Sequence, residues 1–471
     1  MNILDAFAAR VIEHPDRIAI VDGGGRATSY HALDARAAAL AAAWTARGLM
    51  PGDRVLLALR VDADLYAALA ALWRIGAAAV FPEPALGLAG LRHAVAATQP
   101  RALLTNGAYR LLPWIVPAVR RIPLRLPLEM HAGTCPTVDL PDDTPALLSF
   151  TSGSTGMPKT ISRSHGFLRA QDAAVAPLLA RDRVDVDLVA FPVFVIANLG
   201  RGITSVLPNW RLSRPLAADP RAIRRHAARA RVTRLLLSPA LADLMVDHLP
   251  EGVDTLFVGG GPVFPDLLDR LRARAPSLRI VAVYGSTEAE PIAHLDWDEA
   301  DAADRKAMRG GAGLLAGAVA RRARVRIADE EILVAGDHVV PGYLDPSRDS
   351  TTKVRDADGV VWHRTGDAGY LDDRHRLWLL GRHEARVGTL RPFPVENAAR
   401  SWPGVRRAAL AGMSGRAVLA IEGDAAHLPI WRARFAELGG ADVRLVRRLP
   451  LDRRHGSKVD LPRLVAMLRA R

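Results

Sequence analysis

The chain has 471 residues, of which 49% are hydrophobic, and it carries a formal net charge of +13. This length is too great for one simple core, so we expect at least two domains, and the hydrophobic content excludes wholesale disorder. The single cysteine, Cys135, cannot form an internal disulfide, which suits a cytoplasmic protein.

The composition also disfavours membrane-spanning and nucleic-acid-binding proteins. No apolar run reaches the ~18 residues that a membrane-spanning helix needs, and residues 1–5 do not begin a secretory signal. Arginine is spread along the whole chain, aromatic residues make up only 5%, and no nucleic-acid-binding motif is present, so we expect no nucleic-acid partner. The positive charge could instead attract an anionic substrate, an acidic carrier protein or a membrane surface, and the sequence leaves these three open.

The first two thirds of the chain alternate helices with short apolar strands. We expect helices at 29–48 and 62–75, and strands at 55–59, 77–81, 103–105, 189–191, 234–237, 255–258 and 281–284. This alternation predicts parallel α/β sheets. In open sheets of this kind, ligands bind beyond the carboxyl ends of the strands.

The pattern changes after about residue 325. Short strands joined by Gly/Asp turns are expected at 325–327, 331–334, 360–362 and 377–380, followed by a small α+β segment. We therefore expect a domain boundary at about Glu384, between a large N-terminal domain with a small β-rich subdomain over residues 1–382 and a small α+β domain over residues 388–471.

The most informative segment is a loop of small hydroxylated residues and glycines that comes after the apolar Leu147-Leu148. It consists of Thr151, Ser152, Gly153, Ser154, Thr155 and Gly156, and ends at Lys159. Glycines let a backbone approach an anion, hydroxyls and free N–H groups bind phosphate oxygens, and the ammonium adds positive charge. The loop lacks the Walker A spacing. The alternative is an exposed Ser/Gly linker, but such linkers rarely come directly after an apolar strand.

Lysine is scarce in this chain, which makes each lysine a candidate for a special role. Of 63 basic residues only four are lysines, namely Lys159, Lys306, Lys353 and Lys458. A compact ammonium cannot be replaced by the planar guanidinium at every site. Lys159 ends the phosphate loop and Lys458 lies in a polar segment near the C-terminus, whereas chance survival is a reasonable explanation for Lys306 and Lys353.

Four further segments carry polar chemistry, although each also has an ordinary structural explanation. Gly259–Gly261 could accept a flat ring or could be a plain turn. Tyr284–Glu288 offers an aromatic face, hydroxyls and a carboxylate suited to Mg²⁺, but a lone glutamate is more often only solvated. Asp367 could accept two ribose hydroxyls with Arg382 nearby, or could belong to a hairpin. The Lys458 segment could be the start of a surface helix.

In this order and spacing, these motifs resemble the adenylate-forming superfamily of acyl-CoA synthetases, peptide-synthetase adenylation domains and luciferases, over essentially the whole chain. The resemblance implies a large N-terminal domain, a hinge at 383–387 that contains Glu384, and a small mobile C-terminal domain. It implies activation of a carboxylic acid by ATP and Mg²⁺ as acyl-AMP. It also implies the following roles: phosphate contacts from Thr151, Ser152, Gly153, Ser154, Thr155, Gly156 and Lys159; nucleotide contacts from Gly259, Gly260, Gly261, Tyr284, Gly285 and Ser286; Mg²⁺ and phosphate contacts from Thr287 and Glu288; a ribose site from Asp367 and Arg382; and a catalytic cation, Lys458.

The segments between the motifs are similar to the olefin β-lactone synthetase branch, in which the substrate's own β-hydroxyl closes the ring. The chain departs from that branch in its shorter length and from most of the superfamily at Thr160 and Glu384. We therefore expect transfer of the acyl group to CoA or a carrier protein, with lactone closure as the alternative. Transfer to an amine and a catalytically silent nucleotide-binding regulator are the minor alternatives.

An apolar acyl pocket is expected just after the strand at 189–191. Its predicted lining is Phe191, Phe194, Val195, Ala197, Asn198 and Gly200. Few charges occur there, and no acidic residue is placed to bind an α-amino group, so an apolar, fatty or β-hydroxy fatty acid is the favoured substrate.

Overall fold

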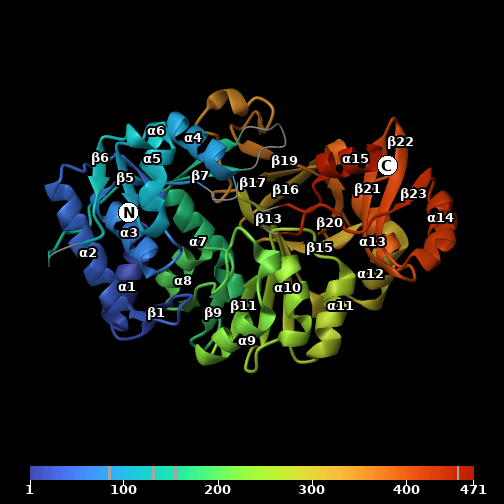
Figure 1. The fold of residues 1–471 in the computed structure, drawn as a ribbon, viewed down its shortest axis with the longest axis horizontal. Helices are drawn as coiled ribbons and strands as arrows, with labels where there is room; N and C mark the ends of the chain where they lie inside the picture. Colours follow the sequence, from blue (N-terminus) through green and yellow to red (C-terminus); the bar gives the residue numbers. More distant parts are fainter. Residues whose placement is uncertain (83–85, 130–132, 152–157, 453–455, 471) are drawn as a thin grey trace.

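A computed structural model describes residues 1–82, 86–129, 133–151, 158–452 and 456–470. Three sheets follow one another from one end of the molecule to the other (Figure 1), and the first two strands of the chain belong to the middle, fourteen-stranded sheet. Within the described residues, no helix is long and apolar enough to cross a membrane.

The first sheet has six strands in the order β6-β5-β3-β4-β7-β8, all parallel except the β7–β8 pair. Its strands are β3 (Arg54–Ala58), β4 (Ala78–Phe81), β5 (Ala102–Thr105), β6 (Leu124–Leu126), β7 (Pro145–Thr151) and β8 (Lys159–Ser164). The accompanying helices are α1 (Asp5–Glu13), α2 (Tyr30–Ala46), α3 (Ala63–Ile75), α4 (Gly87–Thr98), α5 (Leu112–Ile115) and α6 (Pro117–Arg120), with the 3₁₀ helix η2 (Gly107–Leu111) directly before α5.

Local signals explain where the two long helices of this region begin. Ser29 and Asp62 precede α2 and α3 and accept hydrogen bonds from backbone N–H groups of the first turn, as preferred N-cap residues do. The α3 helix ends at Gly76, whose positive φ of 88° suits glycine. The predicted helices are therefore confirmed to within about two residues at their ends.

The second sheet has fourteen strands and joins the α/β part to the β-rich part. Its strands are β1 (Ile18–Val21), β2 (Ala27–Ser29), β9 (Val186–Val189), β10 (Thr204–Val206), β11 (Arg234–Leu237), β12 (Thr255–Gly259), β13 (Arg279–Ser286), β14 (Ala289–Asp296), β15 (Leu314–Val319), β16 (Arg324–Ala328), β17 (Glu331–Ala335), β18 (Lys353–Arg355), β19 (Val361–Leu371) and β20 (Arg376–Arg382). The helices of this region are α7 (His165–Leu179), α8 (Phe194–Arg201), α9 (Pro220–Arg229), α10 (Pro239–Met245), α11 (Pro265–Arg274) and α12 (Ala302–Ala307).

One predicted strand of this sheet is displaced in the structure. The strand expected at 189–191 is β9, which ends at Val189. The chain then turns into α8, and the Phe194 N–H donates to the Phe191 carbonyl over 3.0 Å.

The β-rich strands are antiparallel as predicted, and β20 pairs with β15, so they continue the large sheet rather than form a separate one.

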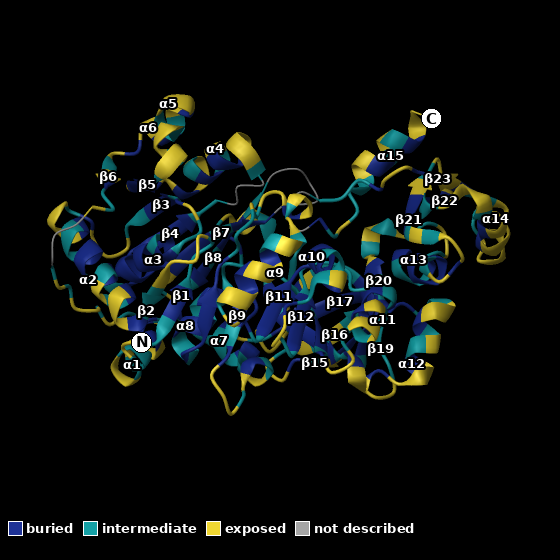
Figure 2. Cartoon of the chain, turned by 60° about the horizontal axis from the view of Figure 1, so that its bottom comes forward, coloured by how far each residue is buried: buried dark blue, intermediate teal, exposed yellow. Residues whose placement is uncertain are grey.

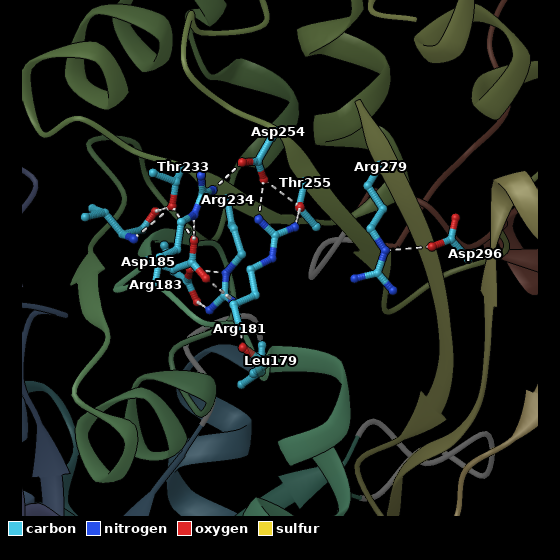
Figure 3. Close-up of polar contacts among 12 residues, drawn as sticks. Leu179, Arg181, Arg183, Asp185, Thr233, Arg234, Asp254, Thr255, Arg279 and Asp296 are labelled. Carbon is cyan, nitrogen blue, oxygen red and sulfur yellow. Dashed lines mark hydrogen bonds and ion pairs between the residues drawn. The ribbon is translucent and has the colours of Figure 1, made fainter. Parts of the chain in front are cut away.

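A buried ion-pair network ties together the starts of the central parallel strands (Figure 3). Arg234 is fully buried and contacts both oxygens of Asp187, at 2.7 and 2.9 Å, and Asp185 at 3.0 Å. At the rim, Arg181 pairs with Asp254 over 2.8 Å (Figure 3). Removing one member would leave a buried charge uncompensated, so we regard this network as part of the framework.

The third sheet, β21-β22-β23, lies at the C-terminal end of the molecule (Figure 1). Its strands are β21 (Val405–Met413), β22 (Arg416–Gly423) and β23 (Asp442–Leu445), and its helices are α13 (Pro392–Arg400), α14 (Leu428–Glu437) and α15 (Leu461–Arg469). Trp431 and Phe435 are buried in a core of this domain's own. The mixed α/β fold with a small C-terminal domain is therefore confirmed; Figure 2 shows the buried strands under more exposed helices.

Candidate active site

A cavity of about 1050 Å³ lies between the large sheet and the C-terminal domain. It is lined by residues that the sequence predicts for a nucleotide and catalytic site: Thr151, Lys159, Gly260, Gly261, Tyr284, Gly285, Ser286, Thr287, Glu288, Asp367, Arg382, Glu384 and Lys458. These residues come from segments more than 300 positions apart in the chain, so the fold brings the separate motifs to one place.

One wall of the cavity is a polar triad from three strands. The Tyr284 hydroxyl at the end of β13 donates to Asp367 Oδ2 over 2.9 Å. Asp367 on β19 is the cross-strand partner of Arg382 on β20, and Arg382 Nη1 lies 3.4 Å from Asp367 Oδ1. The Asp367 charge raises the pKa of Arg382, while burial and that same charge raise the pKa of Tyr284. The triad therefore presents a carboxylate held by two donors.

The glycine cluster lies where parallel strand β12 ends, beside the end of β13 that carries Tyr284, and Gly260 and Gly261 line the cavity. A Cβ atom at Gly259 would lie 2.9 Å from the Val283 carbonyl oxygen, and Gly260 has a φ of +79°. A Cβ atom at Gly261 would lie 2.6 Å from the Cβ atom of Ser457. The sequence assigns this cluster to a flat ring, and the structure adds that the C-terminal segment packs against it.

The segment that carries Lys458 is held in place from both domains. Asp452 Oδ1 accepts hydrogen bonds from the backbone N–H groups of Ser457 and Lys458, at 2.9 and 2.8 Å. Ser457 Oγ accepts a hydrogen bond from the Ala240 N–H over 3.1 Å, at the start of α10 in the N-terminal domain. Lys458 is exposed and lines the cavity. The C-terminal domain thus presents this lysine to the same cavity as the triad.

Glu288 lines the cavity near Tyr343, whose ring Lys159 also approaches. Its Oε1 accepts a hydrogen bond from the Tyr343 hydroxyl over 2.9 Å. Burial alone would raise the pKa of Glu288, but His363, the Tyr343 hydroxyl and Lys353 more than offset it, so the pKa is lowered. Thr287, the preceding residue, accepts a hydrogen bond at its backbone carbonyl from Arg163 over 2.8 Å. Glu288 is therefore an ionised carboxylate on a fixed backbone.

Three residues near Glu288 were missed as site residues from the sequence: Tyr343, Lys353 and His363. Lys353 Nζ lies 3.3 Å from His363 Nδ1, its cross-strand partner, and 5.4 Å from the centre of the Tyr343 ring. Burial lowers the pKa of Lys353 to about 8 and that of His363 to about 4. Burial therefore favours the neutral form of His363, and Tyr343 and Lys353 are among the groups that lower the pKa of Glu288.

The predicted phosphate loop lies mostly outside the described residues. Ser152, Gly153, Ser154, Thr155 and Gly156 belong to that part. Its flanks are described: Thr151 and Lys159 are cross-strand partners at the ends of β7 and β8. Lys159 Nζ lies 5.0 Å from the centre of the Tyr343 ring, so this lysine and Lys353 both approach the residue that holds Glu288.

The predicted acyl-pocket residues lie on or just before α8 and do not line the described part of the large cavity. Val195 is fully buried, and Phe191 and Phe194 contact each other edge to face at 6.2 Å. Asn198 is also fully buried and donates to Asp187 Oδ2 and Ser205 Oγ, both at 3.1 Å. Ala197 packs against the core, and the Gly200 Cα faces α1, where an added Cβ would lie 3.2 Å from Ala6 Cβ. The side chain of Asn198 thus serves the framework in this structure.

Glu384, the predicted hinge residue, lies in a short 3₁₀ helix, His383–Ala385, directly after β20. The turn between β16 and β17 contacts this region, because Arg386 lies 3.6 Å from Glu330 and His383 Nε2 lies 3.0 Å from the Asp329 carbonyl oxygen. A segment this short, with partners on the large sheet, is well placed to change the orientation of the C-terminal domain.

The fold and the site together define an adenylate-forming ligase. The chain belongs to the AMP-binding enzyme family, whose model matches residues 7–344. It is 32% identical to an olefin beta-lactone synthetase of Xanthomonas campestris, over 88% of this chain and 84% of the relative. It is 29% identical to a feruloyl-CoA synthase of an Amycolatopsis species, over 95% of this chain and 88% of the relative.

Solved structures agree on the fold. An amide bond synthetase from Marinactinospora thermotolerans superimposes with a TM-score of 0.83 at 23% identity, covering 99% of this chain and 100% of its own. An o-succinylbenzoate coenzyme A synthetase from Bacillus subtilis, solved with ATP and magnesium ion, has a TM-score of 0.78 at 22% identity, covering 97% and 99%. The family match and the 32% identical relative confirm the predicted superfamily.

Proposed function

We propose that this ligase activates an apolar carboxylic acid with ATP as its acyl-AMP, and that the acid is a β-hydroxy acid which the enzyme closes to a β-lactone. The observation that carries the first step is the shared cavity, which is lined both by Lys458 of the C-terminal domain and by the triad of Tyr284, Asp367 and Arg382. A carboxylate and a triphosphate repel each other, and a cation that touches both lowers the barrier to their reaction.

In this proposal, different residues of the cavity bind different parts of ATP and of the carboxylic acid. Asp367 and Arg382 bind the ribose hydroxyls, and the glycine edge and Tyr284 enclose the adenine. Lys159, with the phosphate loop, binds the β- and γ-phosphates. Lys458 contacts both the attacking carboxylate and the α-phosphate, so that attack on phosphorus forms the acyl–phosphate bond as the bond to pyrophosphate breaks.

In this proposal, Glu288 is a ligand of a magnesium ion. Mg²⁺ is usually held by one or two carboxylates together with substrate phosphates and water. Glu288 lines the cavity, and its lowered pKa favours the ionised carboxylate that a magnesium ion requires. A bound Mg²⁺ would neutralise the departing pyrophosphate.

The relatives support lactone closure as the second step. The two olefin beta-lactone synthetases, from Xanthomonas campestris and Stenotrophomonas maltophilia, share 32% and 31% identity with this chain over 88% of its length. A β-lactone is the cyclic ester of a β-hydroxy acid. The β-hydroxyl oxygen attacks the acyl carbon, the bond from that carbon to AMP breaks, and the hydroxyl proton is released with AMP. Holding both groups in one cavity supplies the effective concentration for this attack.

Transfer to a thiol is the second candidate. It is favoured by two further relatives, the feruloyl-CoA synthase and a salicyl-AMP ligase / salicyl-S-ArCP synthetase of Mycobacterium tuberculosis, at 29% and 30% identity. CoA or a carrier protein would then displace AMP. This candidate needs a path for the thiol to the acyl carbon, which lactone closure does not.

Product analysis tests both steps. Purified enzyme is incubated with ATP, Mg²⁺ and a series of fatty and β-hydroxy fatty acids, with and without CoA, and pyrophosphate and acyl products are measured. We expect pyrophosphate release with apolar acids. With β-hydroxy acids and no thiol, we expect repeated turnover to AMP and a product lighter than the acid by one water.

The outcomes separate the candidates. Stoichiometric acyl-AMP that is discharged only when CoA or a carrier is added would reject lactone closure and support the thiol ligase. ATP binding without pyrophosphate release from any apolar acid would contradict activation itself and would support a silent nucleotide-binding regulator.

A further inference from the structure

The elements α4, η2, α5 and α6 form a basic and apolar surface at the N-terminal end of the molecule. Residues 84–128, which span these elements, contain six arginines and no aspartate or glutamate. The three helices lie side by side in Figures 1 and 2, with α4 contacting α6 and α6 contacting α5. We call this face the α4–α6 surface; its exposed residues are Leu88, Arg92, Arg110, Leu111, Trp114, Ile115, Arg120 and Arg121.

Large apolar side chains on this surface are unusually exposed. Trp114 is 82% exposed, Leu111 57% and Ile115 52%, and all three lie within five residues of one another. The same segment is anchored from beneath by Val116 and Val119, which are fully buried in a core that also contains Phe150 of β7. Buried contacts of this segment are thus made by other side chains than the exposed ones. A cluster of exposed apolar side chains of this kind marks an interaction site.

The arginines around this apolar tip are not neutralised by their own fold. Arg92, Arg110, Arg120 and Arg121 are exposed, and none pairs with a carboxylate among the described residues. Arg101, by contrast, lies 3.2 Å from Asp53, and Arg125 donates to the backbone carbonyl of Arg120 over 2.9 Å. The outward-facing arginines therefore leave a positive potential around Trp114.

We propose that the α4–α6 surface docks the enzyme onto a lipid bilayer that contains anionic lipids. Aromatic and aliphatic side chains on a short amphipathic segment, flanked by arginine, are the combination that binds the boundary between headgroups and acyl chains. The apolar residues lie on single turns at a protruding tip, a shape that suits a deformable planar surface. Docking does not depend on the proposed reaction, although an apolar acid substrate would itself be concentrated in such a membrane.

Vesicle binding tests this proposal directly. The intact protein is sedimented with vesicles of phosphatidylcholine alone and with vesicles of phosphatidylcholine mixed with phosphatidylglycerol. We expect binding to the mixed vesicles, which weakens with salt, and much weaker binding to phosphatidylcholine alone. Arg120→Glu/Arg121→Glu should weaken binding about thirtyfold or more. Leu111→Ser/Trp114→Ser should weaken it roughly tenfold.

Two matched controls distinguish this surface from the general positive charge of the chain. Arg447→Glu/Arg448→Glu makes the same charge change at another adjacent and exposed arginine pair. Ile12→Ser removes an apolar side chain that is 82% exposed, as Trp114 is, but lies on α1. Both controls should bind mixed vesicles within about twofold of the unmodified protein. Unfolding temperatures of all variants are compared, so that a folding defect is recognised.

Tryptophan fluorescence locates the contact independently of affinity. Of the nine tryptophans in the chain, all within the described residues, Trp114 is the exposed one. Lipids brominated in the acyl chain should quench part of the fluorescence on binding, and Trp114→Phe should bind almost normally but lose that quenching. Three results would overturn the proposal: no binding to mixed vesicles, equal loss of binding in the Arg447/Arg448 control, or a surface that instead mediates self-association or capture of an acidic carrier protein.

Discussion

Arg400 and Asp266 form a two-pronged ion pair between the C-terminal domain and the N-terminal domain. Nε of Arg400 lies 2.7 Å from Oδ1 of Asp266 on α11, and Nη2 lies 2.9 Å from Oδ2. Arg407 adds a weaker contact of 3.4 Å to Asp243 on α10. These pairs hold the arrangement in which Lys458 reaches the cavity.

Arg400→Gln should loosen this arrangement. Removing the Arg400 guanidinium leaves Asp266 with the longer contact of 3.9 Å to Arg270 on its own helix, which does not join the two domains. We therefore expect trypsin to cleave the segment after β20 several-fold faster. Acid-dependent pyrophosphate release should fall by a similar factor. Arg309→Gln is the matched control, because Arg309 pairs with Asp269 on the same helix over 2.6 Å without joining the two domains. Equal cleavage in both variants would show that the Arg400 pair does not hold the domain.

Glu384→Pro tests the proposed hinge at 383–387. Proline fixes φ near −65°, and hinge residues act by absorbing changes in φ and ψ. We expect several-fold slower turnover with little change in the unfolding temperature. Glu384→Ala should retain turnover, because alanine leaves φ free to change. Normal turnover in the proline variant would place the pivot elsewhere or make the motion unnecessary.

Lys458→Ala should slow acyl-AMP formation about 10²- to 10³-fold, since it removes a charge aimed at the reacting phosphate. The dissociation constant for ATP, measured by calorimetry, should change little. Lys458→Arg should also be poor, because a planar guanidinium does not replace a compact ammonium. Lys306→Ala, at an exposed lysine of α12, is the control and should be fully active. Activity of Lys458→Arg at the unmodified level would contradict this role.

Lys353→Met should shift the pH dependence of the reaction. Lys353 and Tyr343 help to hold the pKa of Glu288 low, so removing the ammonium raises that pKa. If ionised Glu288 is required, the acidic limb of kcat/KM for ATP moves to higher pH, and Tyr343→Phe moves it in the same direction. Lys306→Met should leave the profile in place. An unchanged profile in both Lys353→Met and Tyr343→Phe would mean that Glu288 ionisation does not limit the reaction.

Glu396→Gln should change how stability depends on pH. Burial raises the pKa of Glu396 in the folded protein to about 7, above its usual 4.5. The folded state then binds more protons than the unfolded state between these values, so stability is full below pH ~4.5 and is lost as pH rises to ~7. Glu396→Gln should remove this loss in the free energy of unfolding, which is of the order of 3 kcal/mol. At pH 8 the variant should therefore unfold at a higher temperature than the unmodified protein.

The same measurement in Glu437→Gln provides the comparison for Glu396. Glu437 is exposed on α14 of the same domain, so its substitution should leave the pH dependence of unfolding unchanged. A stability curve for Glu396→Gln that tracks the unmodified protein from pH 4 to 8 would show that Glu396 ionises without cost in the folded state.

Local signals made much of the fold predictable. The strand at 234–237 is found with the predicted bounds, and the helix after Ser29 begins where its N-cap residue indicates. These features depend on a few neighbouring residues. The bounds of β9 were predicted less well, because the apolar run there continues through Phe191 into the turn before α8, and hydrophobicity does not separate a strand from the residues directly after it.

The missed parts of the site depend on contacts between distant segments. Tyr343, Lys353 and His363 meet Glu288 only through the pairing of β18 with β19 and the return of the chain past β8. The scarcity of lysine was the one available signal for Lys353. Asn198 was predicted to line the acyl pocket together with its apolar neighbours. Its amide donates a hydrogen bond to buried Asp187, a contact between separate elements that the sequence did not indicate, and its role in the pocket stays a prediction.

The large sheet has a consequence for the order of events during turnover. Strands β12 and β13, which end at the glycine edge and Tyr284, and strands β19 and β20, which carry Asp367 and Arg382, belong to one continuous hydrogen-bonded sheet. In the proposed reaction, these nucleotide-binding parts would stay together if the C-terminal domain changed its orientation. The ATP site would then be assembled before Lys458 reached the α-phosphate, and domain movement rather than assembly of the site would limit the rate.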